Sequence, residues 1–252
     1  MKALLGKRVV ITRPSGQAGH LAQLVREAGG EPLCIPAIEI QPLADTSAFR
    51  AVAERLDSFD LAIFVSRNAV RSALALLEGR PWPSGLKVAT IGQGSREELE
   101  AQGFAGVIAP AAQSDSEALL ALPELASVGG QRIVIFRGDG GRALLGEELG
   151  RRGASVEYAA CYRRLRPAAG ELPRLWQGGV DAVTVSSAEG LENFLQMLGA
   201  EAARRLASIP LVVPHARVAE HAARHGLARV LLAGPRDAQM VAALVAYFGH
   251  AS

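Results

Sequence analysis

The chain has 252 residues, of which 49% are hydrophobic and 21% charged, and its formal net charge is +2. A charge this small gives no argument for binding to nucleic acid, and an aromatic content of 5% argues against a platform for stacked bases. No apolar run reaches the roughly 18 residues of a membrane span, and the N-terminal residues do not resemble a secretory signal. With only two cysteines, Cys34 and Cys161, we expect a cytoplasmic protein with reduced thiols.

Short apolar runs alternate with amphipathic stretches along the chain, which predicts strands that alternate with helices. Strands are expected at 9–12, 61–65, 87–91, 107–109, 132–136, 181–185, 211–213 and 230–233. Helices are expected at 17–28, 69–77, 95–102, 116–122, 142–151, 188–198, 216–224 and 237–248. Because the strands are continuous runs of valine, isoleucine and leucine, we expect parallel sheets with helices on both faces.

Two long extended segments, 32–42 and 155–167, interrupt this alternation and carry prolines and polar residues among β-forming residues. The remaining strands are too many for one ordinary sheet, so we expect two domains connected by these segments. Residues 1–36 and 168–252 are expected to form one discontinuous α/β domain, and residues 43–157 a second α/β domain. Residues 37–42 and 158–167 are expected to be the two linker strands.

Hydroxyls, glycines and arginines follow the predicted strands, at the points where helices begin. Ligands of open parallel sheets bind beyond the carboxyl ends of the strands, where helix N-termini offer unpaired amides. The candidate binding residues are Thr12, Arg13, Ser66, Arg67, Asn68, Gly92, Ser95, Arg137, Gly138, Ser186, Ser187, His215 and Arg217. Taken singly, each serine fits an ordinary helix cap and each arginine a solvated or paired side chain. Their recurrence in both halves of the chain favours a cleft that holds a polyanion.

Conventional catalytic and cofactor motifs are missing. There is no phosphate-binding loop, no nucleophile elbow and no CxxC pair, and Gly92-Gln93-Gly94 lacks the third glycine of a dinucleotide fingerprint. His221 and His225 lie four residues apart, and Glu220 or His215 could add a third metal ligand. A solvated helix face is the simpler interpretation, so no metal is expected. Such a protein would act mainly by holding a reactive substrate in one conformation.

Six segments match a known family in order and spacing: VVITRP at 9–14, IFVSRNAV at 63–70, VATIGQGS at 88–95, IVIFRGDGGR at 133–142, YAACYRRLRP at 158–167 and VTVSSAEGLENF at 183–194. On these segments the chain resembles the uroporphyrinogen-III synthase family. The resemblance implies two flavodoxin-like, doubly wound parallel-sheet α/β domains joined by a two-stranded antiparallel linker. It also implies a lyase of heme (porphyrin) biosynthesis that needs no cofactor.

The implied reaction cyclises the linear tetrapyrrole hydroxymethylbilane to uroporphyrinogen III. Water is lost, and ring D is inverted through a spiro intermediate. The resemblance implies a catalytic role for Tyr162, either as the acid that helps hydroxide leave or only as a packed binding residue. Tyr158 is expected on the same strand face. After Pro214, where many relatives carry hydroxyls, this chain has His215 and Arg217, so the donors there could be Arg217, His215 or backbone amides.

The implied partner is a small molecule, the linear tetrapyrrole polycarboxylate, and neither nucleic acid nor a membrane is expected as a partner. We expect a monomer that can receive its substrate by transient channelling from the preceding pathway enzyme. The alternative hypothesis is a non-catalytic two-domain binding module for a small anionic ligand, which would keep the cleft without needing Tyr162.

Overall fold

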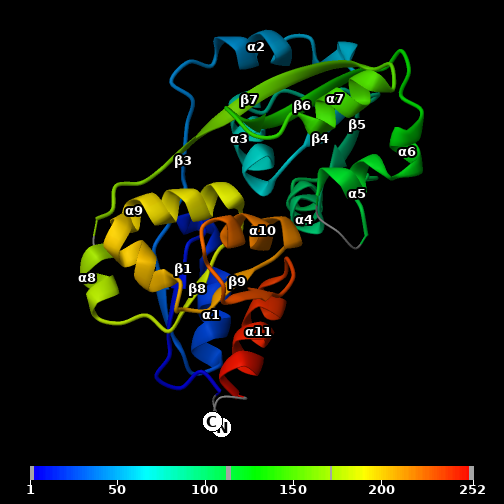
Figure 1. Ribbon diagram of the computed structural model, residues 1–252. Coiled ribbons are helices and arrows are strands. Elements are labelled where there is room, and N and C mark those ends of the chain that lie inside the picture. Colours follow the sequence, from blue (N-terminus) through cyan, green and yellow to red (C-terminus); the bar gives the residue numbers. More distant parts are fainter. Residues whose placement is uncertain (1–2, 112–114, 171, 250–252) are drawn as a thin grey trace. The chain divides into compact units, whose positions relative to one another are not determined.

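Two five-stranded sheets organise the chain in the computed structural model (Figure 1). The structure describes residues 3–111, 115–170 and 172–249. Residues group into two compact units, unit 1 (Met1–Glu39 with Leu165–Ser252) and unit 2 (Ile40–Arg164). The ends of the predicted discontinuous domain, residues 1–2 and 250–252, lie outside the described residues. The mixed α/β architecture with parallel strands confirms the expected fold class at this level.

The sheet of unit 1 has the order β10-β9-β8-β1-β2, and its paired strands run parallel. Its strands are β1 (Arg8–Ile11), β2 (Glu31–Cys34), β8 (Ala182–Thr184), β9 (Leu211–Val213) and β10 (Val230–Leu232). Its helices are α1 (Gly19–Glu27), α8 (Leu172–Gln177), α9 (Ala188–Leu206), α10 (Ala216–Arg224) and α11 (Asp237–Gly249), with a 3₁₀ turn, η1 (Ser15–Gln17).

The two faces of this sheet are covered by different helices. Val9 and Ile11 of β1 pack in a buried cluster with residues of α1 and α11. Val10, which points to the other face, packs in a cluster with residues of α8, α9 and α10. Successive strand residues alternate between the faces, so both faces need apolar side chains and the strand reads as a continuous hydrophobic run.

The sheet of unit 2 has the order β3-β7-β6-β4-β5, in which β4 to β7 are joined by parallel pairs. Its strands are β3 (Glu39–Gln41), β4 (Leu61–Phe64), β5 (Lys87–Thr90), β6 (Arg132–Gly138) and β7 (Ser155–Leu165). Its helices are α2 (Ser47–Ala53), α3 (Arg67–Leu77), α4 (Gln93–Ala101), α5 (Ser116–Leu120), α6 (Pro123–Ala126) and α7 (Leu144–Arg151), with a 3₁₀ turn, η2 (Leu56–Ser58).

Unit 2 also has one cluster on each face of its sheet. Phe64 packs with residues of α2, α3 and α4, and its ring stacks on Phe136 with a centroid distance of 4.8 Å. Leu61 and Ile63 face the opposite cluster, which contains residues of α5, α6 and α7. The aromatic side chains of this unit's core are concentrated on the first of these faces. None of the described helices combines the length and the apolar character needed to cross a bilayer.

Three local features differ from the sequence-based expectation. The predicted strand 107–109 is only an isolated bridge between Ala89 and Ile108, because Gly106 at φ 66° turns the chain immediately before it. The predicted helix 188–198 resumes after a break at Gly199 (φ 75°) and ends at Leu206. The short helices α2, α6 and α8 have no counterpart among the predicted elements.

Thr90 connects two strands of unit 2 through a fully buried hydroxyl that donates to the carbonyl of Phe64 at 2.7 Å. Thr90→Val keeps the side-chain shape but removes the donor, so we expect it to lower the free energy of unfolding by about 1–2 kcal/mol. Urea denaturation measures this change. Thr46→Val is the control, because the Thr46 hydroxyl makes no capping bond to α2. Equal stability of the two variants would contradict the prediction.

Candidate functional site

The carboxyl ends of the parallel strands carry most of the predicted binding residues. We call residues 12–18, 185–187, 214–217 and 233–237 the unit 1 rim, and residues 65–68, 91–95, 137–142 and 162–164 the unit 2 rim. Each rim follows the ends of strands within one sheet, the place where ligands of open α/β sheets bind.

Tyr162, the predicted catalytic residue, lies on β7 and is only 1% exposed. Its hydroxyl oxygen is 3.2 Å from the Ser66 hydroxyl oxygen and accepts a hydrogen bond from the Arg164 guanidinium at 3.1 Å. The same guanidinium lies over the Tyr162 ring, with its central carbon 5.6 Å from the ring centroid. The phenol oxygen is therefore held between a hydroxyl and a cation.

A β-bulge in β7 determines where Tyr162 points. Arg137 of β6 is paired with Ala160 and the next residue, Gly138, with Tyr162, so Cys161 is an extra residue on β7. Because of the extra residue, Cys161 and Tyr162 both join the buried cluster that contains Phe64 and Phe136.

Tyr158 lies on the other side of the strand, so the expectation that the two tyrosines share a face is wrong. Its hydroxyl donates to the Ala143 carbonyl at 3.2 Å, its side chain is 42% exposed, and the Arg137 guanidinium lies 4.8 Å from its ring centroid. Strict alternation along an unbulged strand would have placed both rings together. The bulge breaks that alternation between them.

Gly138 is part of the same arrangement. A Cβ atom at this position would lie 2.9 Å from Cε2 and 3.0 Å from Cζ of Tyr162, closer than side chains approach one another. The missing side chain of Gly138 is thus what allows the Tyr162 ring to lie against β6. Gly138 contributes packing space for Tyr162 rather than a hydrogen-bond donor on a side chain.

Two of the predicted serines are helix N-caps. The Ser66 hydroxyl accepts from the amide of Ala69 at the start of α3, and the Ser187 hydroxyl accepts from the amide of Gly190 at the start of α9, both at 3.0 Å. Capping uses only the lone pairs of the oxygen, so the hydroxyl proton remains able to donate. The capping role and a ligand-binding role are compatible at these two positions.

Two arginines of the unit 2 rim, Arg67 and Arg137, are bonded to backbone carbonyls. The Arg67 guanidinium donates to the Gly94 carbonyl at 2.9 Å, with Glu97 more distant at 3.5 Å. Arg137 donates to the carbonyl of Gly140, and among the described residues no carboxylate lies within ion-pair distance of it. A carbonyl fixes a guanidinium in place without cancelling its charge. Arg67 and Arg137 are therefore oriented cations, suited to carboxylate ligands.

In the unit 1 rim, one arginine, Arg13, is neutralised by a carboxylate. Arg13 forms an ion pair with Asp237, and both side chains are about 85% buried, being 15% and 14% exposed. Arg13 also donates to the Ser186 hydroxyl at 3.1 Å, while His20 lies 2.7 Å from the other oxygen of Asp237. Thr12 is buried and donates to the Thr184 carbonyl at 2.9 Å, so its proton is used inside the unit.

The remaining predicted binding residues lie at helix starts. Gly92 is the N-cap residue of α4 and Ser95 is buried in the first turn of that helix. Asn68 lies in the first turn of α3 and is half-buried. In unit 1, His215 is the N-cap residue of α10 and Arg217 is exposed in its first turn.

Three polar residues that contact predicted site residues or candidate metal ligands in the structure were not predicted from the sequence. Arg164 contacts Tyr162 from two positions further along β7, a spacing that places both on one strand face. Asp237 begins α11 directly after a strand end, a position typical of an acidic residue at a helix N-terminus. Glu192, in the second turn of α9, lies beside His221 and His225, instead of the Glu220 or His215 considered from the sequence.

The comparison with protein-family models follows these observations. The model for uroporphyrinogen-III synthase HemD matches residues 19–242. The chain belongs to the uroporphyrinogen-III synthase family. It is 35% identical to the uroporphyrinogen-III synthase of Salmonella typhimurium over 190 residues, which cover 73% of this chain and 77% of that protein. It is 31% identical to the Escherichia coli synthase over 195 residues, covering 75% and 79%.

Solved structures of the family share the fold. A mutant uroporphyrinogen III synthase from the extremely thermophilic bacterium Thermus thermophilus aligns with a TM-score of 0.66 at 19% identity, covering 98% of this chain and all of that chain. The uroporphyrinogen-III synthetase of Helicobacter pylori aligns with a TM-score of 0.62 at 14% identity, covering 96% and 99%. These identities are low, so the likeness supports the α/β architecture and not individual side-chain roles.

Cys161 lies next to Tyr162, but it is a poor nucleophile. Its thiol is buried, and desolvation raises its pKa to about 12, although its hydrogen bond to the Arg137 carbonyl acts in the opposite direction. We expect a thiol reagent at a pH of about 8 to modify the exposed Cys34 alone in the native protein, because the thiolate is the reactive form. Mass spectrometry counts the labels. Rapid labelling of Cys161 without unfolding would contradict this assignment.

Gly138→Ala tests the packing of Tyr162 on β6. The added Cβ would push the buried ring out of place, so we expect the free energy of unfolding to fall by about 1–3 kcal/mol. Gly140→Ala is the matched control in the same loop, because a Cβ there meets nothing within 4 Å. Urea denaturation compares the two. A Gly138→Ala variant as stable as Gly140→Ala would show that the ring is not confined by Gly138.

Proposed function

We propose that the chain catalyses the reaction of its family, the cyclisation of hydroxymethylbilane to uroporphyrinogen III with loss of one water and inversion of ring D. The observation that carries this proposal is the family match over residues 19–242. The order of the strands in unit 1, read β2-β1-β8-β9-β10, supports the finer description of that unit as a flavodoxin-like doubly wound domain.

The charge of the substrate fits the donors of the rims. Hydroxymethylbilane carries four acetate and four propionate side chains, and each needs a hydrogen-bonding partner when it leaves water. On the unit 2 rim, Arg137 offers a fixed guanidinium group with no described carboxylate within ion-pair distance. Arg67 offers a second guanidinium, which is bonded to the Gly94 carbonyl and lies 3.5 Å from Glu97. In unit 1, the amides at the starts of α9 and α10 and the exposed Arg217 offer further donors. We propose that these groups bind the substrate carboxylates.

The chemical step needs a proton for the departing hydroxyl. When the C–O bond breaks, the hydroxyl leaves as water after taking a proton, and the pyrrole nitrogen supplies electrons to the remaining carbon. We propose that this proton comes from Tyr162, directly or through the Ser66 hydroxyl to which it is bonded. Arg164 would stabilise the phenolate that remains.

The later steps regenerate the acid. The substituted carbon of ring D attacks the electrophilic carbon and forms the spiro intermediate, which fragments and closes again with ring D reversed. A proton is then lost from the ring carbon and returns to the phenolate, so that the net change is the loss of one water. Positioning of ring D decides the product, since the chemistry of the pyrroles supplies the reactivity.

The test of the function is the identity of the cyclic product. Hydroxymethylbilane is incubated with the purified protein, the products are oxidised, and the type I and type III porphyrins are separated by chromatography. Spontaneous closure gives type I, so predominance of type III is the expected result. A product that stays type I would overturn the proposed function and leave a non-catalytic binding module.

Tyr162→Phe tests the proton donor. We expect the rate of type III formation to fall by about tenfold to a hundredfold, because general acid catalysis contributes factors of this size. The matched control is Tyr158→Phe, which removes the same atom from the opposite face of β7 and should keep most of the activity. An unchanged rate for Tyr162→Phe, with the control also unchanged, would limit Tyr162 to packing.

A further inference from the structure

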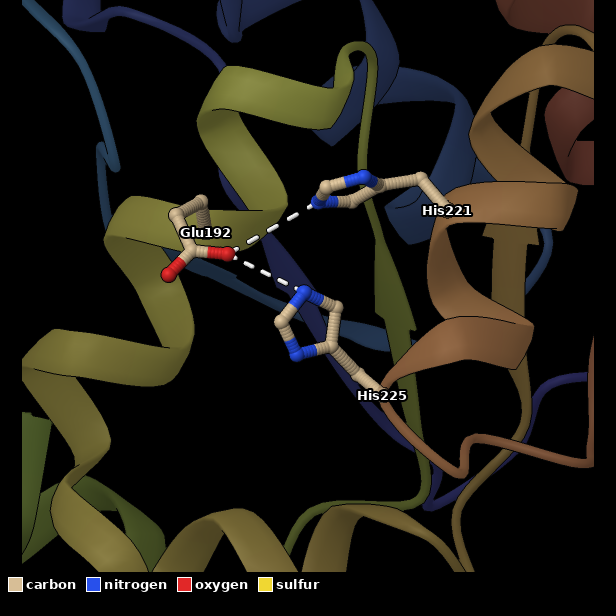
Figure 2. Close-up of side chains that lie close together, drawn as sticks. All are labelled: Glu192, His221 and His225. Atoms are coloured by element: carbon tan, nitrogen blue, oxygen red, sulfur yellow. Dashed lines mark ion pairs between the residues drawn. The ribbon is translucent and has the colours of Figure 1, made fainter.

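Three potential metal ligands meet on the surface of unit 1, and none of them belongs to the rim of that unit. Glu192 of α9 faces His221 and His225, which lie at the end of α10 (Figure 2). Oε2 of Glu192 is 3.0 Å from Nε2 of His225 and 3.7 Å from Nε2 of His221. The three ligand atoms all lie within 4.8 Å of one another. Figure 2 shows both imidazole rings directed toward the same carboxylate oxygen.

These distances are close to those of a tetrahedral metal site. Metal–nitrogen and metal–oxygen bonds of about 2.0–2.1 Å at tetrahedral angles separate neighbouring ligand atoms by about 3.3 Å. The two measured separations, 3.0 and 3.7 Å, lie on either side of this value. Small side-chain rotations would therefore bring all three atoms to one ion, without movement of the helices.

A second residue orients the carboxylate. Gln196, one turn further along α9, donates to Oε1 of Glu192 at 3.0 Å and leaves Oε2 directed at the imidazoles. This hydrogen bond and the two histidines hold the pKa of Glu192 below its usual value, against the effect of burial. Partners that fix a ligand in this way are typical of metal sites. The carboxylate is thus positioned before any ion arrives.

Nε2 of His221 has no hydrogen-bond partner although this atom is buried from solvent. A buried polar nitrogen without a partner is unusual in a folded protein, and this one is directed at Oε2 of Glu192 from beyond hydrogen-bonding distance. Arg224 accounts for the proton on this nitrogen, which a metal ion would have to displace. Its guanidinium lies 3.3 Å from Nδ1 of His221 and can only donate, which leaves the ring proton on Nε2.

We propose that Glu192, His221 and His225 form a binding site for one divalent transition-metal ion per chain, of the class that prefers imidazole with a carboxylate, such as Zn²⁺. Two nitrogens and one oxygen favour this class over Mg²⁺ and Ca²⁺, which prefer oxygen ligands. The ion would connect α9 to α10 within unit 1 and leave a fourth position for water. Metal binding moves the ring proton of His221 to Nδ1 and releases the exposed Arg224.

The test is a Zn²⁺ titration of the full chain without an affinity tag, after treatment with a chelator. Native mass spectrometry counts the bound ions and calorimetry measures the affinity. We expect one Zn²⁺ per chain, and no competing binding by Mg²⁺. His225→Ala and Glu192→Gln should weaken Zn²⁺ binding by about tenfold or more, as changes at metal sites do. His20→Ala is the matched control, since His20 pairs with a different carboxylate, Asp237, in the same unit.

Two further measurements separate the metal site from a simple ion pair. Arg224→Ala should strengthen Zn²⁺ binding, because the competing donor at Nδ1 is gone; a mere ion pair gives no such gain. Zn²⁺ should also raise the melting temperature of the wild type but not of His225→Ala. Absence of saturable binding, or binding that His225→Ala and Glu192→Gln leave unchanged, would overturn the proposal whatever the stability of the variants.

Discussion

The bulge in β7 is the constraint on which the unit 2 rim depends. One extra residue, Cys161, turns Tyr162 toward the face that carries the aromatic core, where its ring lies on Gly138. From there its hydroxyl meets the N-cap of α3, Ser66, and the next residue on the same strand face, Arg164. A strand without the bulge would direct the same tyrosine toward α7 and separate it from both partners. The register of one strand pair therefore assembles the group to which we assign the proton transfer.

The arginines of the two rims differ in how closely a carboxylate is paired with them. In unit 1, Arg13 is buried against Asp237, so the pair contributes little net charge to the surroundings and mainly fixes the start of α11 beside the end of β1. In unit 2, Arg137 is oriented by a neutral carbonyl and has no described carboxylate within ion-pair distance, whereas Arg67 is bonded to the Gly94 carbonyl and also lies 3.5 Å from Glu97. An anion approaching the second rim meets fixed cations, whereas at the first it meets mainly backbone amides, hydroxyls and the exposed Arg217.

The sequence predicts most helices and strands because valine, isoleucine and leucine runs mark buried parallel strands such as β4 and β6. It also indicates which loops follow those strands, and so most members of both rims, although Arg164 and Asp237 are not among them. The sequence does not predict the register of strand pairs. The bulge at Cys161 does not change the alternation of apolar residues, so the sequence predicts Tyr158 and Tyr162 on one face of the strand. Contacts between residues that lie far apart in the sequence cannot be predicted from it either. Asp237 meets Arg13, and Glu192 meets His221, only through the arrangement of the strands and helices of unit 1.

The discontinuous course of unit 1 has a consequence for synthesis on the ribosome. Unit 2 is one continuous segment, so it can fold as soon as Arg164 has left the exit tunnel. The strand β1 lies inside the other sheet, between β2 and β8, and its second neighbour is not made until residues 182–184 have been synthesised. This early strand therefore stays exposed for most of translation. Its apolar segment Val9–Ile11 is the one that chaperones would need to protect during that time.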